Sequence, residues 1–546
     1  MKRTPLILLL ALSILSGSAS DIPHLTKKGN ATQLIVNGKP FIMLAGQVHN
    51  SSSSTLEYMM TVWPKLQNFQ ANTVLMPVSW EQLEPEEGKF DFTLVDGLIR
   101  QARQNDMKIV FLWFASWKSG ASSYAPGWVK KDTKRFPLSK DTDLKSIDML
   151  TPHSTNTRDA DARAYTALLR HIKEVDNAEQ TVVMIQIQNE AGIRFQPRDM
   201  SEAATKVYNA SVPKELMDYL TSKRKTLHPA IISQWQKSGF RTAGTWPEVF
   251  GGYWEADEIF SAWHYAKYVQ AIAVAGKKEY AIPVFVNAWL PDPVGPPHNW
   301  PNGGPTPNML DIWRAAAPDI DCLAPDIFLP TFKELCDEYT RNGHALLIPE
   351  AHRGEDAPAR AYWAIGKYNA LCFAPFGIES MPDNHPLKDS YALLRQALPL
   401  ITDAQGTGRM TAVYQQDNER EQAQTIVQLG TWNLHVRYST NGLPSGTRPG
   451  AIILQTANDE FYILGQGIEI GFKPQSEKGQ QNVDILSSEI GHIEHGIFVS
   501  EIRLNGDEIR AHETPFYRAR IPANVRNTFL DPSKPRILRI RIFSYE

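Results

Sequence analysis

Short apolar runs alternate with segments of helical spacing between residues 41 and 405 of this 546-residue chain. The runs are rich in β-branched residues, which is typical of strands buried on both faces of a parallel sheet. The expected strands are 41–46, 73–78, 108–114, 182–188, 283–289, 322–328, 345–350 and 372–379. The main helices expected around them are 56–69, 95–104, 160–175, 213–224, 255–275 and 390–401. Because such βα units close on themselves at eight strands, the pattern predicts an α/β fold, a (β/α)8 TIM barrel.

The pattern changes near residue 406 to short strands of alternating polarity. These strands are expected at 411–414, 432–438, 451–455, 461–464, 468–472, 497–504 and 537–542. Leu504-Asn505-Gly506-Asp507 adds a hairpin signal. We therefore predict a catalytic barrel over residues 21–405 and an antiparallel, sandwich-like domain over 406–546. The second domain is either a carbohydrate-binding module or a structural cap on the barrel.

The amino terminus has the features of a cleavable signal peptide. Lys2 and Arg3 precede the apolar run 6–12, and Ser18-Ala19-Ser20 supplies the small residues that signal peptidase requires. We expect residues 1–20 to be removed before Asp21, which predicts a secreted or periplasmic protein. The apolar run is too short to span a membrane, so no membrane anchor is expected.

Composition narrows the class of partner. Hydrophobic residues make up 42% and charged residues 21% of the chain, which is typical of a globular protein with a large core. The net charge of −3 provides no basic surface for nucleic acid, and a neutral carbohydrate fits it better. Cys322, Cys336 and Cys372 lie in apolar contexts, and we expect buried free thiols.

Two predicted strands end on a glutamate. Asn189-Glu190 follows the run 182–188, and Glu350 closes the run 345–350. On the strand count these are the fourth and seventh strands, and the carboxyl ends of barrel strands carry catalytic groups. Either glutamate alone would be interpreted as a solvated strand end or a helix cap. As a pair they favour glycoside hydrolysis, which needs one protonated and one ionised carboxyl group.

The segment from Pro77 to Phe92 contains Trp80, Glu84-Pro85, Gly88 and Phe90-Asp91-Phe92. It resembles the Trp…Glu-Pro-x-x-Gly-x-Phe-Asp-Phe signature of β-galactosidases in glycoside hydrolase families 35 and 42, retaining barrel enzymes of clan A. The whole layout is similar to a bacterial branch with a β-rich carboxyl-terminal domain.

The resemblance implies that Glu190 is the acid/base, that Glu350 is the nucleophile, and that Asn189 donates to the sugar 2-hydroxyl. Together with the signal peptide, it implies a secreted retaining exo-β-glycosidase, and no cofactor is expected. The predicted activity is a β-galactosidase that releases terminal β-galactose from oligosaccharides or plant cell-wall side chains.

The chain departs from that family pattern after strand three. Typical family 35 members have Cys-Ala-Glu-Trp there, with a glutamate that binds galactose, whereas this chain has Phe114-Ala115-Ser116-Trp117. The family's His-Tyr pair after strand one appears as His49-Asn50, and its Gly-Gly-Thr-Asn-Phe motif is absent. Because Ser116 replaces a charged ligand, a retaining glycosidase of another sugar specificity stays open. A non-catalytic carbohydrate-binding barrel is a further alternative.

The other candidates for sugar contact lie at strand ends, carry a carboxylate or are aromatic. They are His49, Asn287, Trp289, Trp263, Trp117, Glu84 and Glu379. Each has a structural alternative, namely a hydrogen bond that supports the fold, support of a loop, or a place in the core. His352, Glu355 and Asp356 follow Glu350 without the spacing of a helical metal pair, so no metal site is expected. No oligomeric state is indicated by the sequence.

Overall fold

The structure is a computed structural model that describes residues 22–252, 254–292, 299–416, 424–440, 442–475, 482–504, 518–520 and 534–545. The predicted signal peptide, residues 1–20, lies outside the described residues. The same holds for Asn505, Gly506 and Asp507 of the expected hairpin. Both predictions therefore stay predictions.

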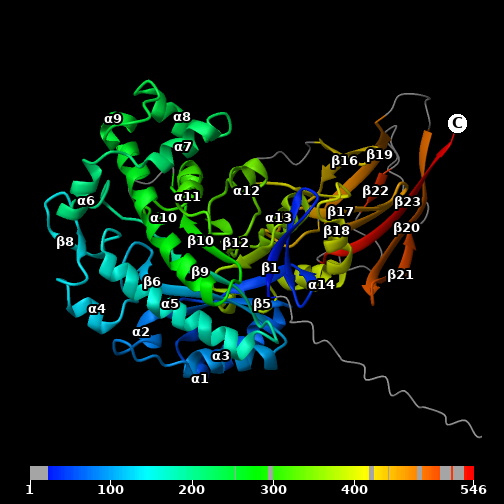
Figure 1. Ribbon diagram of the computed structural model, residues 1–546. Helices are drawn as coiled ribbons and strands as arrows, with labels where there is room; N and C mark the ends of the chain where they lie inside the picture. The colour runs from blue at the N-terminus through cyan, green and yellow to red at the C-terminus, as the bar shows by residue number, and fades with distance from the viewer. Residues whose placement is uncertain are drawn as a thin grey trace, which may run out of the picture.

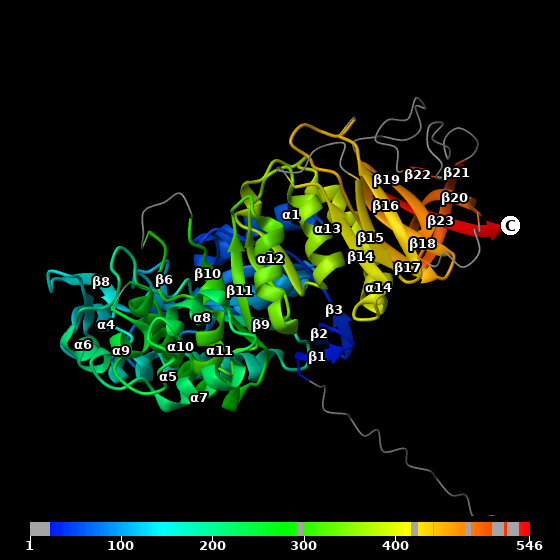
Figure 2. The ribbon, with the colours of Figure 1, turned by 90° about the horizontal axis from the view of Figure 1, so that it is seen from above.

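A closed barrel of parallel strands forms the first part of the chain, as the sequence predicted (Figures 1 and 2). Its strands in order are β4 (Met43–Gln47), β5 (Thr73–Ser79), β6 (Lys108–Lys118), β9 (Val182–Asn189), β10 (Val284–Trp289), β11 (Cys322–Ile327), β12 (Ile348–Ala351) and β13 (Cys372–Pro375). β13 pairs with β4 and closes the barrel.

Helices surround the barrel on its outer side (Figure 1). They are α1 (Leu56–Asn68), α2 (Trp80–Leu83), α3 (Thr93–Gln104), α4 (Gly127–Lys131), α5 (Thr155–Asp176), α10 (Trp254–Glu279), α11 (Leu310–Ala316), α12 (Phe332–Thr340), α13 (Ala357–Tyr368) and α14 (Leu387–Ala404). Short 3-10 turns lie at η1 (Ser52–Ser54), η2 (Pro307–Met309), η3 (Arg341–Gly343) and η4 (Ile378–Ser380).

The apolar strand pattern follows from burial on both faces. Along β6, Val110 and Leu112 belong to the core inside the barrel, whereas Phe111 and Trp113 belong to the core between strands and helices. Successive side chains of a strand point to opposite faces, so a strand covered on both sides has no polar face. This explains why the barrel strands could be located from continuous apolar runs.

Two strand ends differ from the prediction. β13 ends at Pro375 rather than at residue 379, and Glu379 lies on η4. Gly377 adopts φ 65°, a left-handed conformation that a strand does not continue through. β6 in turn continues to Lys118, past the expected end at 114, and its pairing with β9 shifts register between Trp113 and Lys118.

Four helices and two small sheets lie outside the regular alternation of barrel strands and helices. The long segment between β9 and β10 contains α6 (Glu202–Tyr208), α7 (Lys214–Lys223), α8 (Pro229–Gln236) and α9 (Trp246–Phe250), and α7 to α9 gather at one end of the molecule (Figure 1). A small amino-terminal sheet consists of β1 (His24–Lys28), β2 (Ala31–Val36) and β3 (Lys39–Phe41). β7 (Leu138–Lys140) pairs with β8 (Ser146–Leu150).

Two antiparallel sheets form the carboxyl-terminal part. One contains, in spatial order, β14 (Met410–Tyr414), β17 (Gly450–Ala457), β18 (Glu460–Gln466), β23 (Arg536–Tyr545), β20 (Asn482–Glu494) and β21 (Ile497–Leu504). The other contains β15 (Gln424–Leu429), β16 (Trp432–Tyr438), β19 (Ile468–Pro474) and β22 (Arg518–Arg520). Side chains of both sheets, such as Leu434 and Ile463, share one core, so the sheets form a sandwich.

The outer face of the six-stranded sheet packs against the barrel. α13 and α14 lie between the barrel strands and the sheet in both ribbon views (Figures 1 and 2). A Cβ on Gly366 of α13 would lie 2.8 Å from the Ala412 Cβ of β14, so the helix and the strand approach closely. The sandwich is thereby tied to the barrel through a packed apolar contact.

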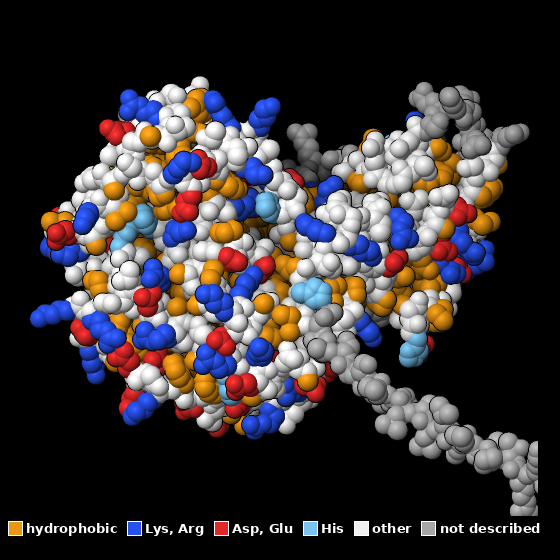
Figure 3. Space-filling model, in the orientation of Figure 1, with side chains coloured by type: hydrophobic (Ala, Val, Ile, Leu, Met, Phe, Trp, Pro, Cys, Tyr) orange, Lys and Arg blue, Asp and Glu red, His pale blue; other side chains and the backbone are white. Residues whose placement is uncertain are grey.

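The surface and the cysteines match the expected class. Acidic and basic side chains are interspersed over the face shown in Figure 3. Cys322, Cys336 and Cys372 are free and buried, as predicted. Among the described residues, no helix combines the length and the apolar character needed to cross a membrane.

Candidate active site

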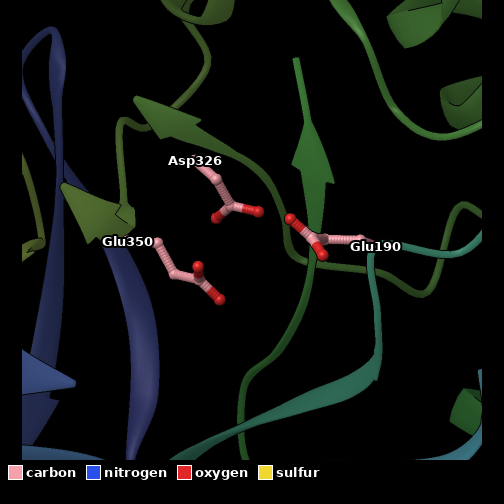
Figure 4. A group of neighbouring side chains, drawn as sticks. All are labelled: Glu190, Asp326 and Glu350. Atoms are coloured by element: carbon pink, nitrogen blue, oxygen red, sulfur yellow. The ribbon is translucent and has the colours of Figure 1, made fainter. Parts of the chain in front are cut away.

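Three carboxylates point into a common space at the carboxyl ends of the barrel strands (Figure 4). Glu190 follows β9, Asp326 lies on β11 and Glu350 on the neighbouring strand β12. Carboxylate oxygens of the three residues lie within 4.8 Å of one another, and all three side chains are buried. The structure thus brings together the two predicted glutamates and adds Asp326. A carboxylate inside the apolar run 322–328 was the sequence signal that could have identified this third residue.

The end of β9 has a constrained backbone that aims Glu190. Gln188 and Glu190 have φ of 60° and 48°, left-handed conformations that cost non-glycine residues roughly 1–3 kcal/mol each. The Glu190 amide donates to Asn287 Oδ1 at 2.9 Å, and Asn287 Nδ2 donates to Asp326 Oδ2 at 2.8 Å. Asn287, a predicted sugar contact, therefore holds two of the three acidic residues in place.

Glu350 is held by two amide side chains. Gln47 Nε2 donates to Glu350 Oε1 at 2.8 Å, and Asn189 Nδ2 donates to the same oxygen at 3.3 Å. Burial, and then the charge of Glu190, raise the pKa of Glu350 above its ordinary value, while Lys118 and the two amide donors oppose that shift. Hydrogen bonds to a carboxylate favour its ionised form, which is the form that a nucleophile needs.

Glu190 has a different set of partners. Ser119 Oγ donates to Glu190 Oε2 at 2.6 Å, and Lys118 Nζ lies 3.5 Å from the same oxygen. Burial acts to lower the pKa of Lys118, but the three carboxylates outweigh it and leave that pKa raised. Sequence reasoning missed Lys118 and Ser119. Two polar residues directly after an apolar strand were the available signal.

Ser116 does not occupy the place that the family resemblance suggested for it. Its hydroxyl donates to Asp161 Oδ2 at 2.6 Å and lies 2.7 Å from the Tyr268 hydroxyl, in the layer between the strands and helices α5 and α10. The register shift of β6 places Lys118 beside Glu190 instead. The polar residue that strand three contributes to the site is therefore a lysine.

Asp326 is the least satisfied of the three acids. Its Oδ2 accepts from Asn287, and its Oδ1 finds no donor in the described parts of the chain. Burial, then Glu350 and Glu190, raise the pKa of Asp326 well above its ordinary value. Burial and neighbouring like charges both favour the protonated form of this acid.

Two protein-family profiles match parts of the chain. The profile of glycoside hydrolase family 42, described as "Beta-galactosidase", matches residues 59–238. This match extends from within α1 to just past the end of α8. A second profile, described as "Domain of unknown function (DUF5597)", matches residues 387–514, which include most of the carboxyl-terminal sheets.

Two curated proteins match the chain over short regions. A "Beta-galactosidase" of Xanthomonas manihotis is 27% identical over 132 residues, which is 23% of this chain and 21% of that protein. "Beta-galactosidase 14" of Arabidopsis thaliana is 34% identical over 97 residues, or 16% of this chain and 10% of that protein. The matched region thus spans about a fifth or less of either relative.

Solved structures resemble parts of the chain at low sequence identity. The β-galactosidase of Bacillus circulans sp. alkalophilus has a TM-score of 0.46 at 14% identity and covers 66% of this chain and 57% of its own. The catalytic domain of a β-amylase from Paenibacillus polymyxa has a TM-score of 0.46 at 11% identity, covering 65% of this chain and 98% of its own.

The remaining residues that the sequence suggested for sugar contact fall into two groups. His49 and Glu379 lie together: the His49 amide donates to Glu379 Oε1 at 2.9 Å, and the His49 ring lies 2.8 Å from Ser380 Oγ. Trp289 is half-buried, and the Arg194 guanidinium lies 4.6 Å from its ring centre. A role of these residues in sugar contact stays a prediction.

The other group has structural surroundings. Glu84 accepts from Trp80 Nε1 and from the Gly88 amide, both at 2.7 Å, so its carboxylate supports the loop after α2. Trp117 and Trp263 are buried in the core, and Trp117 Nε1 donates to the Leu150 carbonyl. Neither ring has an exposed face on which a sugar could stack.

The three acidic residues are also the group that could hold a metal ion. Their oxygens are close enough to share one cation. The Lys118 ammonium already supplies a positive charge beside Glu190, and Asn287 occupies one Asp326 oxygen. The arrangement is suited to acid–base chemistry between paired carboxyl groups.

Proposed function

We propose that this protein is a retaining exo-β-glycosidase that hydrolyses terminal β-galactosides. The observation that carries the proposal is the pair Glu190 and Glu350, which face each other with oxygens within 4.8 Å. Retaining enzymes separate their carboxyl groups by about 5–5.5 Å, whereas inverting enzymes leave roughly 6.5–9.5 Å for a water molecule. The observed closeness favours the retaining arrangement.

The first chemical step is the formation of a glycosyl-enzyme. A carboxylate oxygen of Glu350 attacks the anomeric carbon, and the bond from that carbon to the glycosidic oxygen breaks. The leaving oxygen takes its electron pair and a proton from Glu190. The products are an ester between Glu350 and the sugar, a free alcohol and an ionised Glu190.

The second step returns the enzyme to its starting state. Glu190 removes a proton from water, the water oxygen bonds to the anomeric carbon, and the ester bond to Glu350 breaks. Glu350 leaves as a carboxylate and Glu190 is protonated again. Two inversions at the anomeric carbon retain its configuration.

Unpaired buried acceptors around the site support a ligand rich in hydroxyl groups. Gln47 Oε1, Asn189 Oδ1 and Glu379 Oε2 are buried and find no donor among the described residues. Buried acceptors without donors are costly, and sugar hydroxyls would supply the missing hydrogen bonds. Asn189 Nδ2 or Oδ1 would then contact the hydroxyl next to the anomeric carbon.

The family 42 profile and the names of both curated relatives support galactose as the sugar, carried by an oligosaccharide or a plant cell-wall side chain. A second candidate is a β-glycoside of another sugar. Lys118 favours this second candidate, because a lysine stands where the resemblance led us to expect an acidic galactose ligand. A cation and a carboxylate prefer different groups on a substrate.

The first experiment measures hydrolysis of a panel of nitrophenyl β-glycosides, with α-galactoside as the matched control. We expect the β-galactoside to have the highest kcat/KM, with β-anomeric galactose as the first product by NMR. A preference for another β-glycoside would favour the second candidate. Hydrolysis of none of them would support the non-catalytic alternative, and an α-anomeric product would contradict the retaining mechanism.

A second experiment separates the two carboxyl groups by azide rescue. Glu350→Ala should lose turnover of every substrate, and azide should yield only the inverted α-glycosyl azide. Glu190→Ala should still react with dinitrophenyl glycosides, accumulate the glycosyl-enzyme, and yield the β-glycosyl azide. The opposite pairing of variants and products would exchange the two roles.

We also propose export of the protein after cleavage of residues 1–20. Lys2 and Arg3, the apolar run and Ser18-Ala19-Ser20 support this. Amino-terminal sequencing of exported protein should begin at or near Asp21. An intact Met1 would contradict cleavage.

A further inference from the structure

We propose that Asp326 is a positioning residue that shares the catalytic proton with Glu190. The proposal rests on the proposed glycosidase function, because Asp326 acts through Glu190 rather than on the sugar. It adds a third acid to a mechanism that needs only two.

The geometry leaves one Asp326 oxygen free for this purpose. Asn287 Nδ2 holds Oδ2 at 2.8 Å, so the carboxyl group cannot turn, while the buried Oδ1 has no donor in the described chain. Glu190 lies within the 4.8 Å cluster and is fixed through the same Asn287. A proton on Asp326 converts the unsatisfied acceptor into a donor toward Glu190. Without that proton, two carboxylates would face each other in a buried site.

The charged groups around Asp326 do not neutralise the cluster. Glu350 on β12 and Glu190 after β9 repel its ionised form, and Lys118 on β6 is the cation that opposes them. Tyr339 on α12 also faces Asp326; burial and that carboxyl group raise its pKa well above the ordinary value, so it remains neutral. One ammonium cannot balance three carboxylates, so the cluster retains a proton.

The hydrogen bonds indicate where that proton lies in the resting site. Glu190 accepts from Ser119 and lies beside Lys118. Glu350 accepts from Gln47 and Asn189. Asp326 has the fewest donors, and burial with two like charges raises its pKa well above the ordinary value. The geometry therefore places the proton between Asp326 Oδ1 and Glu190, and Glu190 can deliver it to the substrate.

The proton moves twice in a turnover and is recovered. In the first step it passes from Asp326 Oδ1 to Glu190, and from there to the glycosidic oxygen as its bond to the anomeric carbon breaks. In the second step Glu190 takes a proton from water and shares it again with Asp326 Oδ1, which restores the pair. No other reactant is needed.

The pH profile of Asp326→Asn tests the proposal. Asparagine keeps the shape and can accept from Asn287, but it removes one of two interacting acids. Loss of the like charge should move the basic limb of kcat/KM to lower pH, by about one unit or more, because an adjacent carboxylate otherwise makes the last proton harder to remove. The loss of rate should be larger for a nitrophenyl than for a dinitrophenyl glycoside, since only the first needs the acid.

Two further variants make the result specific. Asp326→Glu retains an acid and should restore much of the basic limb. Glu279→Gln removes one charge from the exposed end of α10, outside the cluster, and should leave the limb where it is. An unchanged basic limb in Asp326→Asn, with both substrates slowed equally, would overturn the proposal.

A readout without turnover separates this proposal from the proposed function. A carboxyl pKa raised by folding makes the wild type lose stability as pH rises from about 4, the unfolded aspartate value, through the raised folded value. The free energy of unfolding of Asp326→Asn, measured with urea, should therefore rise relative to that of the wild type as the pH increases across that window. This holds even if no glycoside is hydrolysed. A pH-independent difference would contradict the shared proton. So would stabilisation of the wild type alone by added Ca²⁺ or Mg²⁺, which would indicate a cation at the cluster.

Discussion

Two buried aspartates lie on opposite sides of the barrel wall and differ in their hydrogen-bond donors and in the charges around them. Asp161, on α5 outside the strands, accepts from Trp113 Nε1, Ser116 Oγ, Gln188 Nε2 and the Tyr268 hydroxyl, at 2.6–3.3 Å. Asp326, inside the carboxyl end of the barrel, accepts from Asn287 among the described residues and has two carboxylate neighbours. Both side chains are nearly inaccessible to water.

The difference distinguishes an acid that supports the fold from one that we propose acts in the site. Burial raises the pKa of Asp161, and its four donors oppose the rise, whereas for Asp326 the charges of Glu350 and Glu190 add to the effect of burial. A satisfied buried carboxylate stabilises one arrangement of its neighbours. An unsatisfied one among like charges is unfavourable for folding, and such strain is typical of a catalytic site. Gln188 connects the two, since it donates to Asp161 and precedes Asn189-Glu190 on β9.

Lys118→Met should cause the largest loss of activity, because it removes the positive charge beside the carboxylates inside the barrel. It removes the ammonium that lowers the pKa of Glu350, so less of the nucleophile is ionised at neutral pH. We expect kcat/KM at pH 7 to fall by roughly 10²-fold, as for loss of a preorganised charge. The acid limb of the pH profile should move upward. Lys118→Arg keeps the charge and is the control; equal losses in both variants would contradict an electrostatic role.

Asp161→Asn makes the same substitution at the outer aspartate that Asp326→Asn makes at the inner one. An asparagine amide must direct its N–H groups at the donors of Trp113 or Gln188, which leaves at least one of them unsatisfied. The free energy of unfolding should fall by about 1–3 kcal/mol. Urea denaturation at pH 7 measures this, with Asp326→Asn beside it. If Asp326→Asn were the more destabilised of the two, the comparison would fail.

Ser119→Ala tests how much the Ser119 hydroxyl contributes to activity compared with the Lys118 ammonium. The variant loses the 2.6 Å hydrogen bond to Glu190 Oε2 but leaves Lys118 in place. A hydrogen bond to a charged group contributes about 1.5 kcal/mol, so kcat/KM should change by roughly 10-fold or less. Ser119→Thr retains the hydroxyl and should behave nearly as the wild type. A loss as large as that of Lys118→Met would show that the hydroxyl matters more than the ammonium.

Gln47→Leu should have the smallest effect. It removes one of two amide donors to Glu350, and because that hydrogen bond lowers the pKa of Glu350, the pKa should rise further. The acid limb of kcat/KM is expected to move upward by about one unit or less, since Asn189 still donates. Gln47→Glu would add a fourth carboxylate and should move the limb further in the same direction. A downward shift in either variant would contradict an ionised nucleophile.

Much of the architecture could be predicted because burial on both faces leaves a direct record in the sequence. The barrel strands, α5, α10 and the strands 432–438 and 497–504 were located from apolar periodicity. The errors lie at strand ends, where a backbone feature overrides the pattern. Gly377 ends β13 before Glu379, and a register shift extends β6 to Lys118.

The sequence by itself determined the parallel barrel, the β-rich second part, and two glutamates at the ends of the fourth and seventh strands. Only the tertiary structure decided which polar groups meet them. Asp326, Lys118, Ser119 and Gln47 belong to three other strands and one adjoining loop, and no local pattern relates residues so far apart in the chain. A shift of β6 against β9 sets Ser116 in the outer layer and Lys118 beside Glu190. Side-chain direction alternates along a strand, so its register against neighbouring strands decides which residue enters the site.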